Sequence, residues 1–492
     1  MIGLLSKYKY LSKIYLCVIP IILYLFNIRE IVFPKNYQQD DVRELNVSNF
    51  LDFSCVINQG DNHPLWSYLI WGFSKLSVFE LGYIISVLNI CLLFGAIYFI
   101  FQFSNEKYGS SVAVLVLTLL VSSPSIITYS ISLKQYMLEL FYSSYCLYVS
   151  KSNETIITKF NSKSFYFFSI FFVMGSLVNA SIFIFLVVYY LIFIKFNLSI
   201  IRYLIFSGLP ILFFLNRILE KINRDSYNSY WENFFISNTV SSGFFNKLTF
   251  IFNLIFKSYF GFIYSDRMLL LLLFIILFSI FLNLKSNLFS KYLIFLFLAL
   301  NFLQLYPLGT GRTDIILFPF YLSLIAEVIF LIKTKINSNL INLITFIVLL
   351  LVLINGTPFY KQEQIYPALV EIKEITNSDT AIVVASEQYN SFEYYGQKVF
   401  GIKEIVKNNC YIKSPKVENY FTINRKSIDK TNFNNKISEI VQFPKILMLG
   451  IELDSRGVFR DFEDAIFKRD YILISSTVYP EGFYFNVYEF KE

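Results

Sequence analysis

The chain has 492 residues, of which 55% are hydrophobic, 19% aromatic and only 16% charged. The core of one soluble domain of this length would not need so many apolar side chains, so the composition excludes an ordinary soluble protein and indicates an integral membrane protein. The net charge of +7 comes mostly from loop lysines, which suits membrane orientation better than nucleic-acid binding. We therefore expect a membrane protein with no nucleic-acid partner.

Apolar runs near the ~20 residues that cross a ~30 Å hydrocarbon layer recur along the chain, and backbone at that depth must be helical. The first run, within residues 1–26, follows lysines as a signal peptide would. It lacks a small-residue cleavage site, so we expect an uncleaved span. The clearest later runs are LLLLLFIILFSIFL at 269–282 and LINLITFIVLLLVLI at 340–354. Roughly eleven spans are expected in residues 1–357.

Lysine and arginine residues occupy alternate gaps between the apolar runs, and the positive-inside rule places these gaps in the cytoplasm. The cytoplasmic set is Lys7, Lys9, Lys13, Lys107, Lys151, Lys159, Lys163, Lys195, Arg202, Lys285, Lys291, Lys333 and Lys335. The opposite gaps then face outward: 33–79, about 124–134, 217–266, 306–314 and everything after 357. Segment 248–268 reads as a further span or an interfacial helix. A span would place the later lysine loops outside, so we expect an interfacial helix on the outer surface.

After Pro358 the pattern changes to short mixed elements. We expect helices at 364–375 (QIYPALVEIKEI) and 459–470 (FRDFEDAIFKRD), strands at 380–386 (TAIVVAS) and 445–451 (KILMLGI), and a hairpin within 471–490. These elements predict a small α/β domain over residues 358–492, on the extracytoplasmic side because it follows the last outward gap. The domains are thus 1–357, a multi-span domain with outer loops 33–79 and 217–266, and 358–492.

The first outer loop carries an adjacent acidic pair, Asp40 and Asp41, in NYQQDDVRELN. Such a pair can supply a general base, hold a divalent cation or simply be hydrated. His63, the only histidine of the chain, follows in GDNHPLW where the chain approaches the membrane again. A histidine there either packs and caps or takes part in chemistry.

Two further outer segments carry side chains suited to binding. The long loop contains NRDSYNSYWENFF, in which Tyr230, Trp231 and Glu232 combine aromatic rings with a carboxylate, as in sugar sites and in interfacial belts. The late outer turn YPLGTGRTDIILFPF holds Arg312. An arginine at headgroup level can snorkel to lipid phosphate, or its planar guanidinium can clamp the phosphate of a lipid substrate.

Taken in order, these features resemble the membrane glycosyltransferases of the GT-C superfamily. The shared features are an acidic pair after the first span, a His-Pro-Leu motif, a YPLG-x-x-R turn late in the chain and an outer C-terminal domain. The similarity is greatest to bacterial members related to protein O-mannosyltransferases and to the aminoarabinose transferase of lipid A. It implies a polytopic α-helical GT-C-like membrane protein of about eleven transmembrane helices with a small C-terminal extracytoplasmic α/β domain.

The resemblance also implies an activity: transfer of a sugar, with inversion, from a polyprenyl-phosphate donor to an extracytoplasmic glycan, glycolipid or protein. Asp40 or Asp41 would activate the acceptor hydroxyl, and Arg312 would hold the phosphate of the leaving lipid. His63 would orient the acidic loop or contact that phosphate. The enzyme would work in the cell membrane, among its lipids, with no certain cofactor and a divalent cation possible.

The sequence departs from this family at two places. Many relatives have two prolines after the histidine, whereas this chain has only Pro64. Many also carry a Glu-x-Arg-Pro-Tyr-like stretch in the second outer loop, where this chain places Ser132, Lys134 and Tyr136. The missing acid puts a metal site in doubt, and Lys134 and Tyr136 then serve as phosphate contacts or as interfacial anchors.

Two other functions fit a polytopic membrane protein. A transporter or flippase for lipid-linked sugars would bury ionisable residues at mid-membrane, whereas these spans read as almost uncharged. A polymerase or ligase of the O-antigen kind would carry its large outer loop between spans. The polar residues gather on the predicted outer face, which favours the glycosyltransferase.

Overall fold

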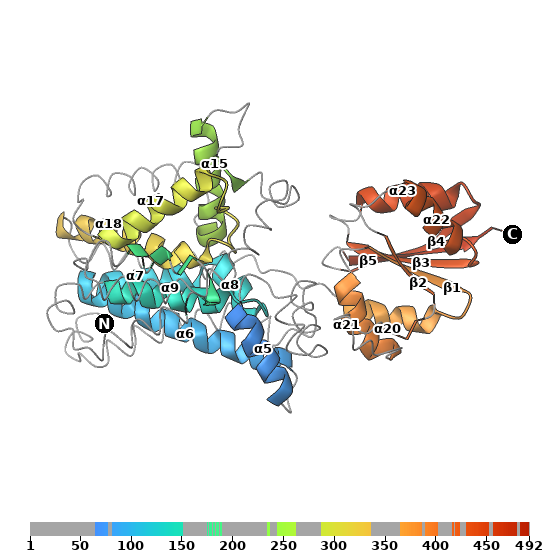
Figure 1. Cartoon of the computed structure of the whole chain (residues 1–492), viewed down its shortest axis with the longest axis horizontal. Helices are drawn as coiled ribbons and strands as arrows, with labels where there is room; N and C mark the ends of the chain where they lie inside the picture. Colours follow the sequence, from blue (N-terminus) through green and yellow to red (C-terminus); the bar gives the residue numbers. More distant parts are fainter. Residues whose placement is uncertain are drawn as a thin grey trace, which may run out of the picture. The chain divides into compact units, whose positions relative to one another are not determined.

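The structure is a computed structural model that describes residues 64–76, 81–150, parts of 175–188, 234–236, 244–261, 287–335, 365–385, 389–401, 416–423 apart from 418, 430–451, 456–479 and 483–491. It forms two compact units, one containing residues 83–359 and the other residues 360–492 (Figure 1). Each is described by itself. The expected spans at 1–26, 269–282 and 340–354 lie outside the described residues, so the total of about eleven spans stays a prediction.

The first unit is helical and apolar enough to cross a membrane. Two helices pass by length and composition, Leu81–Tyr108 and Ile315–Ile332, and a bent pair, Ser110–Val121 with Pro124–Ser130, makes up to three. The shorter helix Leu288–Phe302 is also apolar. These four segments fall on apolar runs of the sequence, so the described part confirms the class of a helical membrane protein.

The described part begins with α5 (Pro64–Leu76), α6 (Leu81–Tyr108), α7 (Ser110–Val121), α8 (Pro124–Ile131) and α9 (Tyr136–Ser150). The bend of 61° between α7 and α8 has a local cause. Pro124 cannot donate a backbone hydrogen bond, so a helix ends before it and a new one starts with Pro124 at its first position. The short helix α8 therefore turns away from α7 before the chain enters α9.

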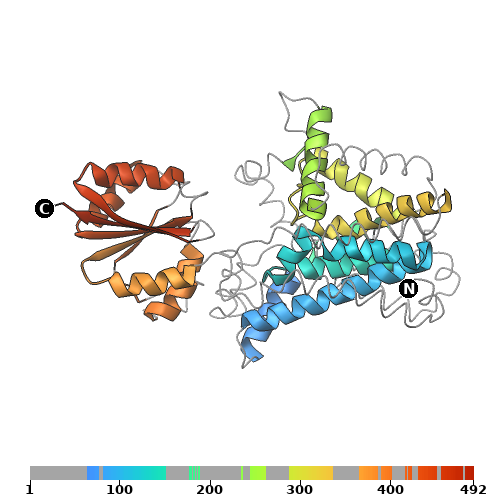
Figure 2. The same cartoon turned by 180° about the vertical axis from the view of Figure 1, so that it is seen from behind.

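Later in the chain lie α17 (Leu288–Phe302), the 3-10 helix η4 (Ile315–Leu317) and α18 (Phe318–Lys335). α17 packs against α18, and a short connection joins them, which makes the two helices antiparallel neighbours. Asn287 at the start of α17 bonds to Glu327 in the later part of α18. The turn containing Arg312 therefore lies at the opposite ends of these helices. Figure 2 shows the helices of this unit from behind.

The segment expected as an interfacial helix forms α15 (Phe244–Phe260). Its buried residues Ile251, Ile255 and Tyr259 repeat every four positions, while Phe250 is 44% exposed, which is the pattern of a helix with one packed face. α15 packs against α8 and is not among the helices that qualify as spans. A helix is therefore present over part of segment 248–268, where it adjoins the end of the unit that carries Arg312, and its position on the outer surface stays a prediction.

The second unit is a three-layer α/β domain (Figure 1). Its sheet has the order β2-β1-β3-β5-β4, built from β1 (Thr380–Ala385), β2 (Tyr420–Ile423), β3 (Lys445–Ile451), β4 (Tyr471–Val478) and β5 (Phe483–Phe490). The first three strands are parallel, and β5 and β4 run antiparallel. Helices α20 (Ile365–Ile375) and α21 (Tyr389–Phe400) cover one face, while α22 (Lys430–Ile440) and α23 (Arg456–Phe467) cover the other.

The five elements expected after Pro358 are confirmed as α20, β1, β3, α23 and the hairpin of β4 and β5. Their buried side chains form a core under α22 and α23 that includes Val383, Ile440, Met448, Phe462 and Tyr488. The sequence missed α21, β2 and α22. The boundary expected at residue 358 stays a prediction.

Candidate active site

The turn between α17 and η4 is organised by the carboxylate of Asp314, which is fully buried. Its Oδ1 accepts hydrogen bonds from the backbone N–H of Gly311 (2.9 Å) and from the Thr310 hydroxyl (3.1 Å). Its Oδ2 accepts one from the backbone N–H of Gly309 (3.2 Å). Asp314 therefore closes the turn through its own side chain and fixes Thr310 and Gly311, the two residues that precede Arg312.

The hydroxyl of Thr310 forms a second set of contacts in the same turn. Its Oγ1 accepts the backbone N–H groups of Arg312 (3.2 Å) and Thr313 (2.9 Å) and lies 2.7 Å from Thr313 Oγ1. The Tyr306 phenol donates to the Thr313 carbonyl. The backbone of Arg312 is therefore held from both sides, and its side chain is half-buried.

Two glycines allow this turn to lie close against α15. Gly309 and Gly311 have φ of +84° and +71°, a region that side chains disfavour. A Cβ at Gly311 would come within 2.7 Å of Ser125 Oγ and 2.8 Å of Ser258 Cβ. Ser125 also donates to the Ser258 carbonyl (2.8 Å). The turn, the start of α8 and the end of α15 therefore form one tightly packed junction.

Burial shifts the pKa values of two groups of the turn, the Asp314 carboxyl and the Tyr306 phenol. Burial raises the pKa of Asp314 to about 6, although hydrogen bonds from Gly309, Thr310 and Gly311 act in the opposite direction. Burial also raises the pKa of the Tyr306 phenol well above its usual range, and the charges of Glu139 and Asp314 add to this effect. Both carboxylates thus lie near Tyr306.

The loop between α8 and α9, residues 132–135, is fixed by long-range hydrogen bonds. The indole N–H of Trp66, in α5, donates to the Leu133 carbonyl (3.0 Å), and the Asn89 side-chain amide, in α6, donates to the Ser132 carbonyl. Ser132 Oγ accepts the backbone N–H of Lys134 (3.2 Å). The helix that starts directly after His63 is therefore tied to the loop that carries Lys134.

A buried carboxylate, Glu139, lies in the first turn of α9 and is 1% exposed. Its Oε1 accepts a hydrogen bond from the Asn179 side-chain amide (3.1 Å). α9 packs against η4, which starts one residue after Asp314. Two segments far apart in sequence, the loop 132–135 with α9 and the Arg312 turn with η4, therefore adjoin each other.

Three of the residues expected in the site lie in this region. Arg312 is in the turn, and Lys134 and Tyr136 are half-buried at the start of α9, where the Tyr136 ring lies 4.5 Å from that of Tyr129. The other six lie outside the described residues, so their positions stay predictions. They are Asp40, Asp41, His63, Tyr230, Trp231 and Glu232.

The described residues do not fit a metal ion. No group of three or more His, Cys, Asp or Glu side chains comes together among them, and both oxygens of Asp314 are engaged by donors of its own turn. Asp40 and Asp41, the pair expected to hold a divalent cation, lie outside the described residues.

The expectation of almost uncharged spans with polar residues at one face has exceptions in the described part. Lys291 and Glu327 form a buried ion pair between α17 and α18, with 3.1 Å between Nζ and Oε1, and Glu139 is buried in α9. Lys291, expected in a cytoplasmic loop, lies in the first turn of α17. A single charged residue barely changes the mean hydropathy of an apolar helix. The partners of these residues also lie 36 or more positions away, so the sequence pattern did not indicate the buried contacts.

The sequence pattern also did not predict the role of the residues that build the turn. Asp314 precedes the apolar run IILFPF, a position typical of a helix N-cap. Its side chain instead reaches back to Gly309 and Gly311, and makes no cap bond to η4. The sequence feature that could have indicated a structured turn is the combination of Gly309, Gly311 and Asp314 around Arg312.

The fold of the chain, an apolar helical unit followed by a C-terminal α/β domain, is similar to the fold of solved archaeal structures. The oligosaccharyltransferase of Archaeoglobus fulgidus, solved in complex with Zn and sulfate, has a TM-score of 0.50 and 13% identity, over 89% of this chain and 67% of its own. The archaeal oligosaccharyltransferase AglB of the same organism, solved with an inhibitory peptide and a dolichol-phosphate, has a TM-score of 0.49 and 12% identity, over 97% and 74%. No protein-family model and no curated protein sequence matches the chain.

At this identity the likeness to the first structure establishes the fold alone. It agrees at the level of the fold with the GT-C resemblance seen in the sequence motifs.

Proposed function

We propose that this chain is a glycosyltransferase that moves a sugar from a polyprenyl-phosphate donor to an acceptor on the extracytoplasmic side of the cell membrane. The observation that carries the proposal is the turn that Asp314 and Thr310 organise around Arg312. A backbone held by so many contacts presents its arginine in a defined position, which a binding group requires and a lipid anchor does not. The GT-C-type fold supports the same function.

In this proposal Arg312 binds the phosphate of the donor. Its planar guanidinium donates two parallel hydrogen bonds to phosphate oxygens, and Lys134 adds a second positive charge from the adjoining loop. The bond between the anomeric carbon and the phosphate oxygen breaks as the acceptor oxygen attacks from the opposite face, so the configuration inverts. Arg312 and Lys134 stabilise the negative charge that develops on the departing phosphate.

The acceptor proton goes to a carboxylate of the first outer loop, Asp40 or Asp41, which acts as general base. His63 precedes α5 directly, and α5 is tied through Trp66 to the loop of Lys134, which supports a role in holding the acidic loop beside the phosphate. Tyr136 contributes to donor binding, and Tyr230, Trp231 and Glu232 bind the sugar or acceptor. The α/β domain would face the same outer side and contact a glycan, glycolipid or protein acceptor.

The test is transfer by the purified full chain in proteoliposomes, supplied with polyprenyl-phosphate sugars and a mixture of envelope acceptors. Asp40→Asn and Asp41→Asn are compared, and one of them should abolish transfer while leaving expression intact. His63→Gln should keep part of the activity, whereas His63→Ala should lose most of it. If both histidine variants are inactive while both asparagine variants work, the base is His63. Absence of any transfer in the wild type, with the donor shown to bind, would refute the proposal.

The buried Lys291 and Glu327 pair favours one second candidate, a transporter or flippase of lipid-linked sugars, because such proteins hold ionisable residues inside the membrane. The same proteoliposomes separate the two functions. A flippase moves the lipid-linked sugar between leaflets without breaking the sugar–phosphate bond, whereas the transferase breaks that bond in the presence of acceptor.

A further inference from the structure

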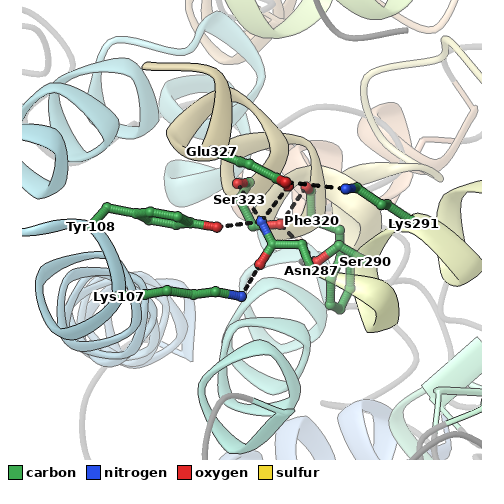
Figure 3. A network of polar contacts seen from close by, with 8 residues as sticks. All are labelled: Lys107, Tyr108, Asn287, Ser290, Lys291, Phe320, Ser323 and Glu327. Carbon is green, nitrogen blue, oxygen red and sulfur yellow. Dashed lines mark hydrogen bonds and ion pairs between the residues drawn. The ribbon is translucent and has the colours of Figure 1, made fainter. Parts of the chain in front are cut away.

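A polar network lies at the opposite end of the membrane unit from the Arg312 turn. It joins α6, α17 and α18 through Lys107, Tyr108, Asn287, Ser290, Lys291, Ser323 and Glu327 (Figure 3). The residues involved are buried except for Lys107, which is partly exposed. Nothing in the proposed transfer reaction uses these groups.

Asn287 is the centre of the network. It has a left-handed backbone with φ of +50°, which is uncommon for a residue with a side chain. Its amide nitrogen donates toward Glu327 Oε2 (2.9 Å), the Ser323 carbonyl (3.1 Å) and the Tyr108 hydroxyl, while its amide oxygen accepts from Lys107 Nζ. The side chain of Asn287 therefore lies between Lys107 and Glu327 (Figure 3).

This arrangement orients Lys107 without neutralising it. The only carboxylate in the network, Glu327, pairs with Lys291 at 3.1 Å, and within the described part of the chain Lys107 makes no ion pair. The Lys107 ammonium lies 5.3 Å from the centre of the Phe103 ring and 5.7 Å from that of Tyr108. Two lysines and one glutamate leave one positive charge, held in place by neutral groups.

The position of Lys107 along α6 indicates which kind of anion can reach its ammonium group. Lys107 is the next-to-last residue of α6, a helix of 28 residues with apolar character, so it lies where a span meets the headgroup layer. Tyr292 nearby on α17 is 54% exposed, as interfacial tyrosines are. An uncompensated cation at that depth attracts phosphate groups of membrane lipids.

We propose that Lys107, oriented by Asn287, binds the phosphate of an anionic membrane phospholipid at the end of the unit opposite to the Arg312 turn. Asn287 prevents direct pairing of Lys107 with Glu327, and Lys291 satisfies that glutamate. The lipid phosphate then completes the charge balance and ties α6 and α17 to the surrounding leaflet.

Native mass spectrometry of the delipidated full chain tests this proposal without any variant. Phosphatidylglycerol and phosphatidylcholine are added in equal amounts, and the anionic lipid should be retained preferentially, with about a fivefold preference expected from one lysine. Equal retention of the two lipids would overturn the proposal. Displacement of phosphatidylglycerol by millimolar inorganic phosphate would overturn the lipid assignment in favour of a soluble anion.

Three variants locate the site. Lys107→Gln should lose the preference, and Lys107→Arg should keep it. Asn287→Gly keeps the left-handed backbone and the net charge but frees Lys107 to pair with Glu327, so the preference should fall as in Lys107→Gln. The control Lys468→Gln removes an exposed lysine of the α/β domain and should change nothing. A Lys107→Gln variant that behaves like this control would refute the site.

Discussion

The Asp314 carboxylate accepts a hydrogen bond from the backbone N–H of Gly311, with 2.9 Å between N and Oδ1. Gly311 immediately precedes Arg312, and this bond fixes the peptide group between Thr310 and Gly311, one residue ahead of the arginine. A second bond from Gly309 to the other oxygen closes the turn. The position of Arg312 is thus determined by a buried carboxylate that need not touch the substrate.

Substitution of Arg312 separates a phosphate clamp from a lipid anchor. Arg312→Lys keeps the charge but loses the two-pronged geometry, and Arg312→Ala loses both, so a clamp predicts graded loss of transfer, with the alanine variant lower. The measurement is kcat/KM for transfer at equal amounts of inserted protein. Lys257→Ala, which removes an exposed cation of α15, serves as the control. Normal transfer by Arg312→Ala would make the residue an anchor.

Asp314→Asn should alter how stability depends on pH. The carboxyl titrates at about 6 in the folded chain against an ordinary value of 3.8, so its folded pKa is raised. Its titration contributes stability that is fully present below pH 3.8 and is lost as pH rises through about 6. The wild type should therefore lose melting temperature relative to Asp314→Asn between pH 4 and pH 6.

The same variant should also be less stable than the wild type throughout this range. An asparagine offers one acceptor oxygen where Asp314 uses two, so the N–H of Gly309 loses its acceptor, at a cost of about 1–3 kcal/mol. Thermal unfolding followed at several pH values measures both effects. Parallel pH profiles for the two proteins would show that Asp314 does not titrate in this window.

The membrane topology can be checked directly. A reporter fused after residue 357 should report from the extracytoplasmic side, and a reporter fused at Lys335 from the cytoplasm. The structure places Lys107 and Lys291 in one network, as expected for lysines of the same side. A cytoplasmic signal from the fusion after 357 would remove both the donor proposal and the extracytoplasmic placement of the α/β domain.

Hydropathy and periodicity predicted the parts of the fold that depend on local pattern. The apolar lengths predicted α6 and α18, and alternating or amphipathic stretches predicted β1, β3 and α23. The missed elements lack such patterns, since α22 reads KTNFNNKISEI and β2 has only four residues. They form because the sheet and its core supply apolar partners, such as Met448 and Phe462 around Ile440.

The candidate site could be predicted only where one residue carries the chemistry. Arg312 and Lys134 stand out as cations in segments predicted to face outward, so the sequence marks them as candidates. Glu139 contacts Asn179 forty positions later, and Trp66 bonds to Leu133. Contacts between residues this far apart depend on how the helices pack, and that packing cannot be predicted from a single sequence.

The glycine before Arg312 provides the last prediction, because its role is purely geometric. Gly311→Ala places a methyl group at φ of +71°, with contacts of 2.7 Å to Ser125 Oγ and 2.8 Å to Ser258 Cβ. The turn must shift away from α15, so we expect a loss of about 1–3 kcal/mol in stability and a fall in transfer like that of Arg312→Lys. The matched control is Gly72→Ala in α5, where a Cβ meets nothing within 4 Å, so the helix should gain about 0.5–1 kcal/mol. Thermal unfolding and transfer are measured for both variants. If Gly311→Ala transfers sugar as well as Gly72→Ala does, the turn does not need its close approach to α15, and Arg312 does not depend on it for its position.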